Sequence, residues 1–426
     1  MLEKVKYVLE NCKLGVESLF WKRDDSVVLI GAWFGEKFAD NSRFLFQYLS
    51  AHKEKHELSH VIWVTRNTKV HDMLTDFGYE VYMMDTPESI MWHKKAKYHI
   101  VCNKGCDGSG YKGDILGKYS YRAKRINLWH GVAGIKGVSC SSNEYKEQKK
   151  LHPVKYFLKE FLFIHCSFYR LFVREAGGWS DSYILTTTPA DTDLMQPRYL
   201  LPRTNFIESG FPRNCKVESL TNNEKKVIDF IKDKKVILYL PTFRSDGFSF
   251  DAAKVVESQI ETLIRLDIIW IQKGHTADYE TSFKKYDIDN VLTLDSDFDI
   301  NVLMPHIDIL VTDYSSVASD AMYHNKLVIY YIPDFEEYKA SSRGLAVDPE
   351  SIMCGPKVYN TSELTESIQK YVVDPESGKS VNYQQVRTKY WNEINDLGVI
   401  FDDIIKHVNL KKKKKGRRIV NGKITY

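Results

Sequence analysis

The stretch SVVLIGAWFGEKFADNSRFLFQYLSAH, residues 26–52, contains one copy of the pattern that decides the fold. Its first five residues, Ser26–Ile30, form an apolar run with the length of a strand that is buried on both faces. After a short loop, Asn41 or Ser42 can cap an amphipathic helix that fills the rest of the stretch. A buried strand followed by a helix is the repeating unit of a parallel α/β sheet.

The same unit recurs through the first half of the chain. A helix is predicted in TPESIMWHKKA (86–96), because Thr86 can cap it and Pro87 suits its first turn. The further strands predicted here are HVIWVT (60–65), YEVYMMD (79–85), KYHIVCN (97–103) and RINLWHG (125–131). This alternation of strands and helices indicates a doubly wound parallel sheet.

A second series of strands begins near residue 205, and a final helix is predicted within residues 380–408. Its strands are predicted in KKVILYLPTF (234–243), DIIWIQKGH (267–275), NVLTLD (290–295), IDILVTD (307–313) and KLVIYYIPD (326–334). We therefore predict an α/β protein of two Rossmann-like domains, glycosyltransferase-B-like in architecture, with a ligand cleft at the carboxyl ends of both sheets. Residues 1–204 would form the first domain, 205–400 the second, and 401–426 the end of the last helix and a polybasic tail.

Composition limits the classes of protein that the chain can belong to. It has 426 residues, of which 43% are hydrophobic and 13% aromatic, which excludes a disordered protein. The net charge is +4, and the basic excess lies in residues 406–426, which argues against a nucleic-acid-binding protein. Seven scattered cysteines without a CxxC pair indicate a reducing compartment and no zinc site. No signal peptide and no run of 18 apolar residues is apparent.

Residues 141–181 interrupt the alternation with a helical segment rich in aromatic residues. Its cations Lys155, Lys159, Arg170 and Arg174 fall on one narrow stripe of the predicted helix. The segment can be a buried helix with a solvated edge, or an insertion that lies in a membrane interface. The basic tail, Lys411, Lys412, Lys413, Lys414, Lys415, Arg417 and Arg418, can be a solvated extension or can bind anionic lipid. Because stable attachment usually needs two signals, the pair favours peripheral membrane binding.

Polar motifs follow several predicted strands. Trp129-His130-Gly131, with Lys136 soon after, places an imidazole where a general base could act, although a structural histidine would give the same pattern. Lys273 and His275 could face one anion, or could be exposed loop residues. No metal site is predicted, because the triplet Asp191-Thr192-Asp193 arises often by chance.

Three further motifs could bind phosphate. Ser315 and Ser316, after Asp313, begin a predicted helix, so they could bind an anion or could cap the helix. Arg244 follows a strand in PTFR (241–244), beside Thr242, and Arg213 lies in the turn GFPRN (210–214). A guanidinium at a strand end can grip a phosphate with two parallel hydrogen bonds.

Taken together, these motifs resemble those of the CDP-glycerol glycerophosphotransferase family of teichoic-acid and capsule polymer enzymes. The most specific segment is DINVLMPHIDILVTDYSSVASDAMYHNKLVIYYIPDFEEY (299–338). The motifs LWHG, GFPRN, LPTFR and KGH, the pairs Arg343-Gly344 and Gly355-Pro356, and the N-terminal FGEKFADNSRFLFQYL occur in the family's order. The resemblance covers residues 26–400.

The resemblance implies an acceptor domain followed by a donor domain. It implies transfer of glycerol phosphate, or in some members ribitol phosphate, from a CDP-activated donor to a hydroxyl, with release of CMP. The substrate would be CDP-glycerol or CDP-ribitol, no cofactor would be required, and the acceptor would be a lipid-linked saccharide or a growing polymer. The enzyme would work peripherally on an anionic membrane surface, at the cytoplasmic face of the bacterial cell membrane.

The resemblance also implies roles for residues. His130 would take the acceptor proton, and His275 with Lys273 would stabilise the pyrophosphate and the departing CMP. The remaining donor or phosphate contacts would be Arg213, Thr242, Arg244, Asp313, Ser315, Ser316 and Glu337, the last on the ribose. Trp129, Gly131, Lys136 and Asp40 would lie on the acceptor side.

The chain departs from the family pattern after LWHG, where Val132–Lys136 replaces Thr-Pro-Leu-Lys-Lys. This departure puts the acceptor in doubt more than the donor. Two alternatives remain open at this point: a glycosyltransferase that uses a nucleotide sugar, and a membrane-associated scaffold without enzymatic activity.

Overall fold

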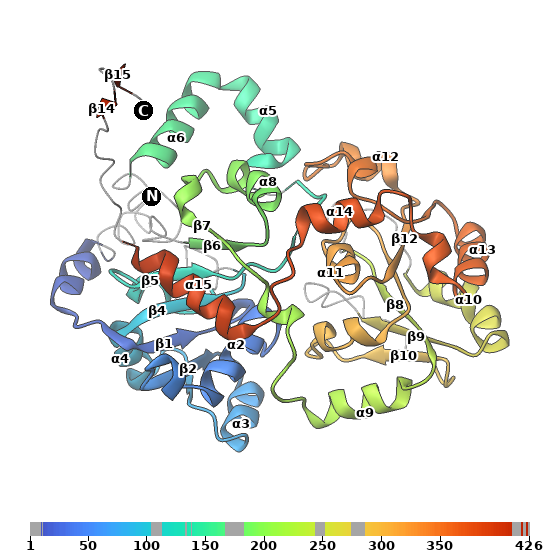
Figure 1. Cartoon of the computed structure of the whole chain (residues 1–426), viewed down its shortest axis with the longest axis horizontal. Helices are drawn as coiled ribbons and strands as arrows, with labels where there is room; N and C mark the ends of the chain where they lie inside the picture. The colour runs from blue at the N-terminus through green and yellow to red at the C-terminus, as the bar shows by residue number, and fades with distance from the viewer. Residues whose placement is uncertain are drawn as a thin grey trace.

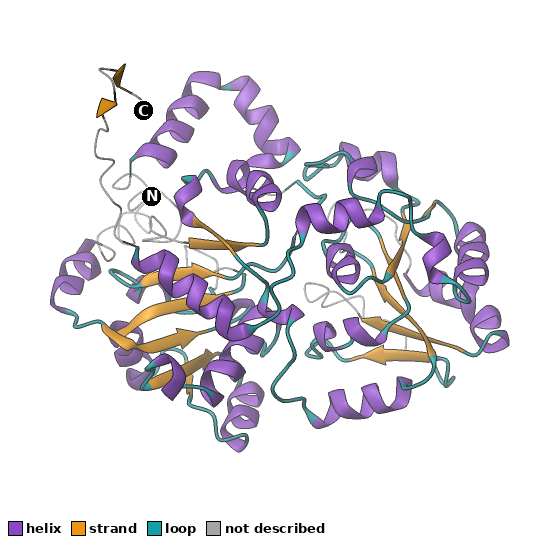
Figure 2. Ribbon diagram, viewed as in Figure 1, coloured by secondary structure: helices purple, strands orange, loops and turns teal. Residues whose placement is uncertain are grey.

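The computed structural model describes residues 10, 12–103, 113–132, 134–137, 139–166, 183–242, 252–273, 286–410, 419–420 and 423–424. Two parallel sheets lie side by side in this part of the chain, one in each half of the molecule (Figure 1). Helices surround both sheets (Figure 2). The predicted fold class, two Rossmann-like units in a glycosyltransferase-B-like arrangement, is confirmed.

The first sheet has seven parallel strands in the order β3-β2-β1-β4-β5-β6-β7. They are β1 (Asp24–Ile30), β2 (His60–Thr65), β3 (Val81–Met83), β4 (Ala96–Val101), β5 (Lys124–Asn127), β6 (Tyr183–Thr186) and β7 (Phe206–Glu208). Val28 and Ile30 of β1 belong to one core cluster, while Val27 and Leu29 belong to another. The continuous apolar run of β1 is therefore explained by burial on both faces.

In the described part of the chain, the helices that accompany the first sheet include α2 (Asp40–Ala51), α3 (Thr68–Asp76), α4 (Pro87–Lys95), α5 (Asn143–Leu151), α6 (Pro153–His165) and α8 (Pro189–Tyr199). Thr86 caps α4 through the Ser89 amide, as the sequence predicts. The ten residues Asp40–Leu49 of α2 are all buried, polar ones included, because this helix lies between the two halves of the molecule (Figure 1).

The second sheet has six parallel strands in the order β10-β9-β8-β11-β12-β13. They are β8 (Lys235–Leu240), β9 (Ile268–Lys273), β10 (Val291–Leu294), β11 (Ile309–Thr312), β12 (Leu327–Tyr331) and β13 (Lys357–Val358). The helices of this half are α9 (Asn222–Ile231), α10 (Ala252–Arg265), α11 (Val317–Tyr323), α12 (Phe335–Ala340), α13 (Thr361–Tyr371) and α14 (Tyr383–Tyr390).

Two boundaries differ from the sequence-based expectation. The strand β7 pairs with β6, so the first sheet extends past the expected limit at residue 205. The predicted final helix is two helices, α14 and α15 (Leu397–Asn409), because the chain leaves α14 after Tyr390 and Asp396 caps a new helix. Asp403 of α15 accepts a hydrogen bond from Ser209, so α15 lies against the first half. The short strands β14 (Ile419–Val420) and β15 (Lys423–Ile424) pair with each other.

The aromatic segment contains α5 and α6, which project from the first half at the top of Figure 1. Its large apolar side chains Leu151, Val154, Phe157, Leu158 and Phe161 are exposed, Phe157 to 65%. The interpretation of α6 as a buried helix is therefore wrong. Lys155 is exposed, and Lys159 lies 5.5 Å from the ring centres of Tyr145 and Tyr156. None of the helices in the described ranges has the length and hydrophobicity needed to span a membrane.

Candidate active site

The loop after β1 forms one wall of a cavity between the two sheets. Trp33, Phe34 and Gly35 follow one another with φ of 44°, 62° and 79°. Left-handed backbone is costly for aromatic residues, so the surrounding structure must hold it in place. The Phe34 amide donates to the Asp114 carboxylate at 2.8 Å, and the Trp33 ring lies 5.5 Å from the His130 ring.

His130 follows β5 on a second left-handed residue, Trp129, with φ of 59°. The Trp129 amide donates to the Asn127 side chain, which fixes this turn at the end of the strand. The imidazole Nδ1 lies 3.2 Å from the Cys102 carbonyl oxygen. Because a carbonyl can only accept, Nδ1 carries the proton and Nε2 keeps its lone pair. Desolvation lowers the pKa of His130, so the ring is neutral at pH 7.

Asn41, at the start of α2, connects the His130 turn to Arg213, which lies in the segment between the last strand of the first sheet and the first strand of the second. Its side-chain amide donates to the backbone carbonyls of Leu128 (3.3 Å) and Trp129 (2.8 Å). Its side-chain oxygen accepts from the Arg213 amide at 3.0 Å. One buried amide therefore fixes both the His130 turn and the position of Arg213.

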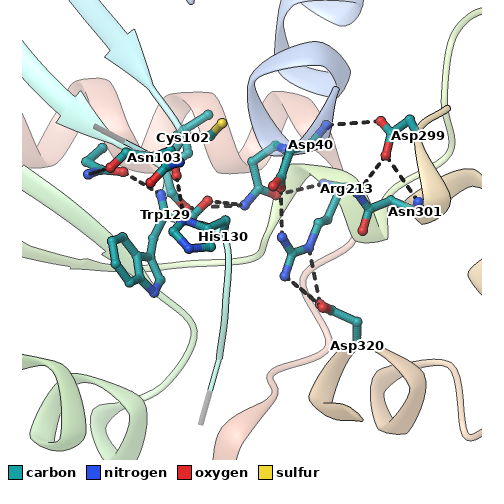
Figure 3. Close-up of polar contacts among 12 residues, drawn as sticks. Asp40, Cys102, Asn103, Trp129, His130, Arg213, Asp299, Asn301 and Asp320 are labelled. Carbon is teal, nitrogen blue, oxygen red and sulfur yellow. Dashed lines mark hydrogen bonds and ion pairs between the residues drawn. The ribbon is translucent and has the colours of Figure 1, made fainter. Parts of the chain in front are cut away.

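Three buried charges form a clamp between the halves, which we define as Asp40, Arg213 and Asp320 (Figure 3). Arg213 Nη1 donates to Asp40 at 2.7 Å, and Nη2 donates to both carboxylate oxygens of Asp320 at 2.7 and 2.9 Å. Each of the three residues is 4% exposed. Burial opposes the charge of Arg213, but Asp320 and Asp40 outweigh it and raise its pKa. Burial raises the pKa of Asp320 to about 6 against the opposing effect of Arg213.

A second buried group reinforces this contact. Arg43 of α2 binds both carboxylate oxygens of Glu224 in α9, at 2.5 and 2.8 Å. Asp299 accepts from the Asp40 amide at 3.0 Å and from the Asn301 side chain at 2.7 Å. Residues of both halves therefore position the loops around the cavity.

The turn at His130 touches the second half directly. A Cβ atom on Gly131 would lie 2.5 Å from Ser316 Oγ, so this close approach needs glycine. Further on, Lys136 forms a β-bridge with Leu345, and the Gly137 amide donates to the Gly344 carbonyl at 2.9 Å. The loop after the LWHG motif is thus shared between the two halves.

The cavity has a volume of about 490 Å³, within the range of small-molecule sites. Its charged lining residues are the cations Lys37, Lys136, Arg198, Arg213, Lys273 and Arg343, and the carboxylates Asp40, Asp299 and Asp320. Desolvation and the nearby charge of Lys37 lower the pKa of Lys273 to about 8. An excess of cations at the carboxyl edge of two parallel sheets suits an anionic ligand.

Nine predicted site residues line the cavity: Asp40, Trp129, His130, Gly131, Lys136, Arg213, Lys273, Ser315 and Ser316. The predicted residues that lie outside the described part of the chain are His275, Arg244, Arg170, Arg174, Lys411, Lys412, Lys413, Lys414, Lys415, Arg417 and Arg418. The structure therefore brings predicted site residues of the first domain and of the second domain to one cavity.

The structure places four predicted donor contacts differently. Thr242 and Asp313 are buried behind the cavity wall, where the Thr242 amide and hydroxyl both donate to the Asp313 carboxylate. They join the ends of β8 and β11. Glu337 is exposed on α12 and does not line the cavity. Arg213 lines it, but two carboxylates hold its guanidinium, so it is a clamp residue.

The cavity is also lined by residues that were not predicted as site residues, namely Trp33, Lys37, Arg198, Asp299, Asp320 and Arg343, with Asn41 behind them. Arg343 belongs to the pair Arg343-Gly344 of the family's order. Lys37 and Asn41 belong to FGEKFADN, and Asp299 and Asp320 to the segment 299–338, both of which carried the family resemblance. Arg198 had no such signal.

Two metal-related observations concern the described residues. None of their His, Cys, Asp and Glu side chains gather in a group of three or more that could hold a metal ion. In the triplet 191–193, Asp191 accepts from the Thr187 amide, and Asp193 pairs with Arg203. Both carboxylates of the triplet therefore make contacts within the protein around the first turn of α8.

Comparison with known proteins agrees with this geometry. The family model described as CDP-Glycerol:Poly(glycerophosphate) glycerophosphotransferase matches residues 16–398. The teichoic acid poly(glycerol phosphate) polymerase of Bacillus spizizenii is 24% identical over 362 residues, covering 82% of this chain and 84% of the polymerase. The teichoic acid glycerol-phosphate transferase of Staphylococcus aureus is 23% identical over 406 residues, covering 87% and 89%. Three teichoic acid ribitol-phosphate enzymes match over 64%, 40% and 57% of the chain.

A solved structure of the wall teichoic acid polymerase TagF has the same fold, with a TM-score of 0.67 at 18% identity and 96% of each chain covered. The scaffold alternative is set aside, because the matched family consists of enzymes. The chain belongs to the CDP-glycerol:poly(glycerophosphate) glycerophosphotransferase family and is an enzyme of that family.

Proposed function

We propose that the chain transfers glycerol phosphate from CDP-glycerol to a hydroxyl of a membrane-linked acceptor or growing polymer and releases CMP. The observation that carries this proposal is the cavity itself. It combines a neutral histidine, whose Nε2 is available, with six cations on its walls. Phosphoryl transfer depends on positioning and on neutralising charge, and these residues can supply both.

In the proposed reaction, His130 Nε2 accepts the proton of the acceptor hydroxyl as its oxygen attacks the glycerol-bearing phosphorus. A new P–O bond forms, the bond from this phosphorus to the CMP oxygen breaks, and CMP leaves with the electron pair. The imidazolium that results is stabilised by the nearby Asp40 carboxylate, which favours the charged form of His130. The Trp33 and Trp129 rings lie 5.5 and 4.3 Å from the His130 ring, tilted against it, and restrict its orientation.

We assign the donor phosphates to the wall formed by Lys37, Lys273, Ser315 and Ser316. Lys37 and Lys273 come from different halves, and burial together with the charge of Lys37 lowers the pKa of Lys273. Two adjacent ammonium groups repel each other until an anion lies between them, so a pyrophosphate would relieve this repulsion. Thr242 and Asp313 would act indirectly by holding the ends of β8 and β11 in register. His275 and Arg244 remain proposed donor contacts.

The test is CMP release from CDP-glycerol with a lipid-linked saccharide acceptor. His130→Ala should reduce the rate by about 100-fold or more, as expected for a general base. His71→Ala, on the outer surface at α3, should leave the rate unchanged. If CMP is released faster from CDP-ribitol than from CDP-glycerol, the donor is CDP-ribitol. If CMP is released from neither compound, the proposal is overturned. Thermal shifts with nucleotide sugars alone would favour the glycosyltransferase alternative.

We also propose that α5 and α6 attach the enzyme peripherally to the cytoplasmic face of an anionic membrane. The support is the row of exposed apolar side chains on α6, next to exposed lysines of α5 and α6. Such a helix binds through apolar burial and through attraction to anionic headgroups. The basic tail would supply a second signal.

Liposome co-sedimentation tests this attachment. The double substitution Phe157→Glu/Phe161→Glu should abolish binding to vesicles that contain anionic lipid. Phe77→Glu, at an exposed position beside α3, should not change it. Unchanged binding of the double variant would assign attachment to the tail or to a protein partner, and truncation after Leu410 separates these two outcomes.

A further inference from the structure

Asp114 is a fully buried carboxylate that has no part in the reaction described above. Its Oδ1 accepts a hydrogen bond from the Phe34 amide at 2.8 Å. Its Oδ2 accepts from the amides of Cys102 at 3.1 Å and Asn103 at 2.8 Å. One side chain therefore joins the loop after β1 to the residues that follow β4, and both of these segments lie against His130.

The peptide unit between Cys102 and Asn103 lies between Asp114 and the imidazole. Its N–H, which belongs to Asn103, donates to Asp114 at 2.8 Å. Its carbonyl, which belongs to Cys102, accepts from His130 Nδ1 at 3.2 Å (Figure 3). In a planar trans peptide the N–H and the C=O point in opposite directions, so the carboxylate and the imidazole bind opposite edges of the same unit. Hydrogen bonds in series polarise one another, so the carboxylate makes this carbonyl a stronger acceptor for His130.

A second series of contacts runs from the same peptide unit to the His130 turn. The Asn103 carbonyl accepts from the Asn127 side-chain amide at 3.1 Å. The Asn127 side-chain oxygen in turn accepts from the Trp129 amide at 2.8 Å. Asp114 therefore supports both the ring of His130 and the backbone turn that carries it.

Several charges act on His130. Desolvation lowers its pKa, and the hydrogen bond to the Cys102 carbonyl opposes this effect. Three charged side chains add to these effects, a carboxylate that raises the pKa and two cations that lower it: Asp40, Arg213 and Lys136. The Cys102 thiol is neutral, because burial and then the charges of Asp114 and Asp40 raise its pKa. The charge of Asp114 is therefore felt at the residue whose carbonyl binds the imidazole.

We propose that Asp114 is a positioning residue that acts on His130 through the Cys102–Asn103 peptide unit, which rests on the transferase activity proposed above. The peptide unit keeps the proton of the neutral ring on Nδ1. When Nε2 accepts the proton of the acceptor hydroxyl, the carboxylate stabilises the imidazolium through the polarised peptide. Nδ1 keeps its proton throughout, so no proton passes to Asp114. A carboxylate bound directly to a catalytic histidine acts in the same two ways.

The test is an NMR titration of the His130 imidazole in the full-length enzyme without substrate. Asp114→Asn keeps the shape of the side chain and removes its charge. The pKa of His130 should fall in this variant, because the imidazolium loses a stabilising carboxylate. If Asp114 only supports the fold, its loss admits water and the pKa should instead rise toward its ordinary value of about 6.5. The direction of the change therefore separates the two roles.

Kinetics give a second measurement. Asp114→Asn should reduce kcat for CMP release by about 10-fold, the size expected for one hydrogen bond to a charged group. The dissociation constant of CDP-glycerol should not change, because Asp114 does not line the cavity. A weaker affinity for CDP-glycerol with an unchanged kcat would overturn the proposal.

Arg66→Gln is the matched control for loosening of the same loops. Arg66 Nη1 donates to the carbonyls of Phe34 at 2.9 Å and Gly113 at 2.7 Å, so the substitution removes contacts beside Asp114 and keeps the carboxylate. This variant should not lower the pKa of His130. A fall as large as that in Asp114→Asn would assign the effect to loosening and overturn the proposal.

The unmodified enzyme provides a test that needs no folded variant. With isotope-labelled asparagine, the Asn103 amide proton should move downfield as His130 is protonated, with the same midpoint, because the two groups share one peptide unit. An Asn103 signal that does not follow this titration would overturn the proposal, as would an unchanged or raised pKa of His130 in Asp114→Asn. Neither titration uses the donor, so a failure to release CMP would overturn the transferase activity and leave the coupling measurable.

Discussion

Replacing Arg213 by glutamine should destabilise the protein strongly at neutral and alkaline pH. The substitution leaves Asp40 and Asp320, both 4% exposed, without the guanidinium that each of them binds at 2.7 Å. Removing one partner of a buried ion pair costs about 3–5 kcal/mol. This is a large fraction of the 5–15 kcal/mol that typically stabilises a folded protein.

The loss should depend on pH in a defined direction. Without Arg213, the folded-state pKa of Asp320, already raised to about 6, should rise further above its unfolded value. The folded variant then binds more protons than its unfolded chain, so its stability is greatest at low pH and falls as pH rises through the folded pKa. Each further unit of pKa adds about 1.4 kcal/mol to the difference between the two ends of the window.

Urea denaturation of both proteins at pH 5 and pH 8, followed by circular dichroism, measures this effect. The difference between Arg213→Gln and the unmodified protein should be larger at pH 8. The matched control is Arg203→Gln, because Arg203 is 46% exposed and pairs with Asp193 and Glu208. Its loss should be about 0–1 kcal/mol at either pH. A loss below about 1 kcal/mol for Arg213→Gln at pH 8, or a loss that grows toward pH 5, would refute the clamp.

Three other predictions concern the cavity. Gly131→Ala should reduce CMP release and should lower the stability of the fold by about 1–3 kcal/mol, because the added methyl group meets Ser316 Oγ at 2.5 Å. Gly15→Ala is the control, because the nearest neighbour of its added methyl group lies at 3.7 Å. As pH falls, kcat/KM should decline with a midpoint below pH 6.5, because desolvation lowers the pKa of His130 and protonation of His130 removes the base. A midpoint at or above pH 7 would contradict this assignment. Affinity for CDP-glycerol should weaken as pH rises above about 8, because Lys273 then loses its charge. Lys273→Met should remove this dependence of affinity on pH. If the dependence is unchanged in Lys273→Met, the donor binds elsewhere.

Much of the fold was predictable because buried parallel strands are apolar on both faces. The runs in 26–30, 60–65 and 234–243 are of this kind: the first is most of β1, the second is β2, and the third contains the whole of β8. Short edge strands carry less signal. β7 has three residues, too few for a periodic pattern, so its membership of the first sheet depends on pairing with β6, which periodicity does not encode.

The sequence placed together the residues that follow strand ends, but it did not indicate the contacts between residues that are distant along the chain. His130, Lys273 and Ser316 line one cavity, as expected from their positions after strands of parallel sheets. The clamp joins residues 40, 213 and 320, and nothing in the sequence indicates that two carboxylates share one arginine. For the same reason, the sequence suggested that Arg213 contacts phosphate. The left-handed backbone of Trp33 and Phe34 was equally hidden, since aromatic residues rarely adopt it.

The division of contacts between the halves suggests how the site is assembled. The contacts that orient His130 come from the first half alone, namely the Cys102 carbonyl, the Trp33 ring and the Asn127 side chain that fixes Trp129. The proposed donor wall needs both halves, since Lys37 lies in the first half and Lys273 and Ser316 lie in the second. The clamp and the Gly131–Ser316 contact hold these parts together. Asp320→Asn loosens the clamp but keeps Asp40 and Arg213, whose charges act on the pKa of His130. This substitution should therefore weaken donor binding more than it changes the pKa of His130, and a titration of that histidine beside a donor-binding measurement separates the two effects.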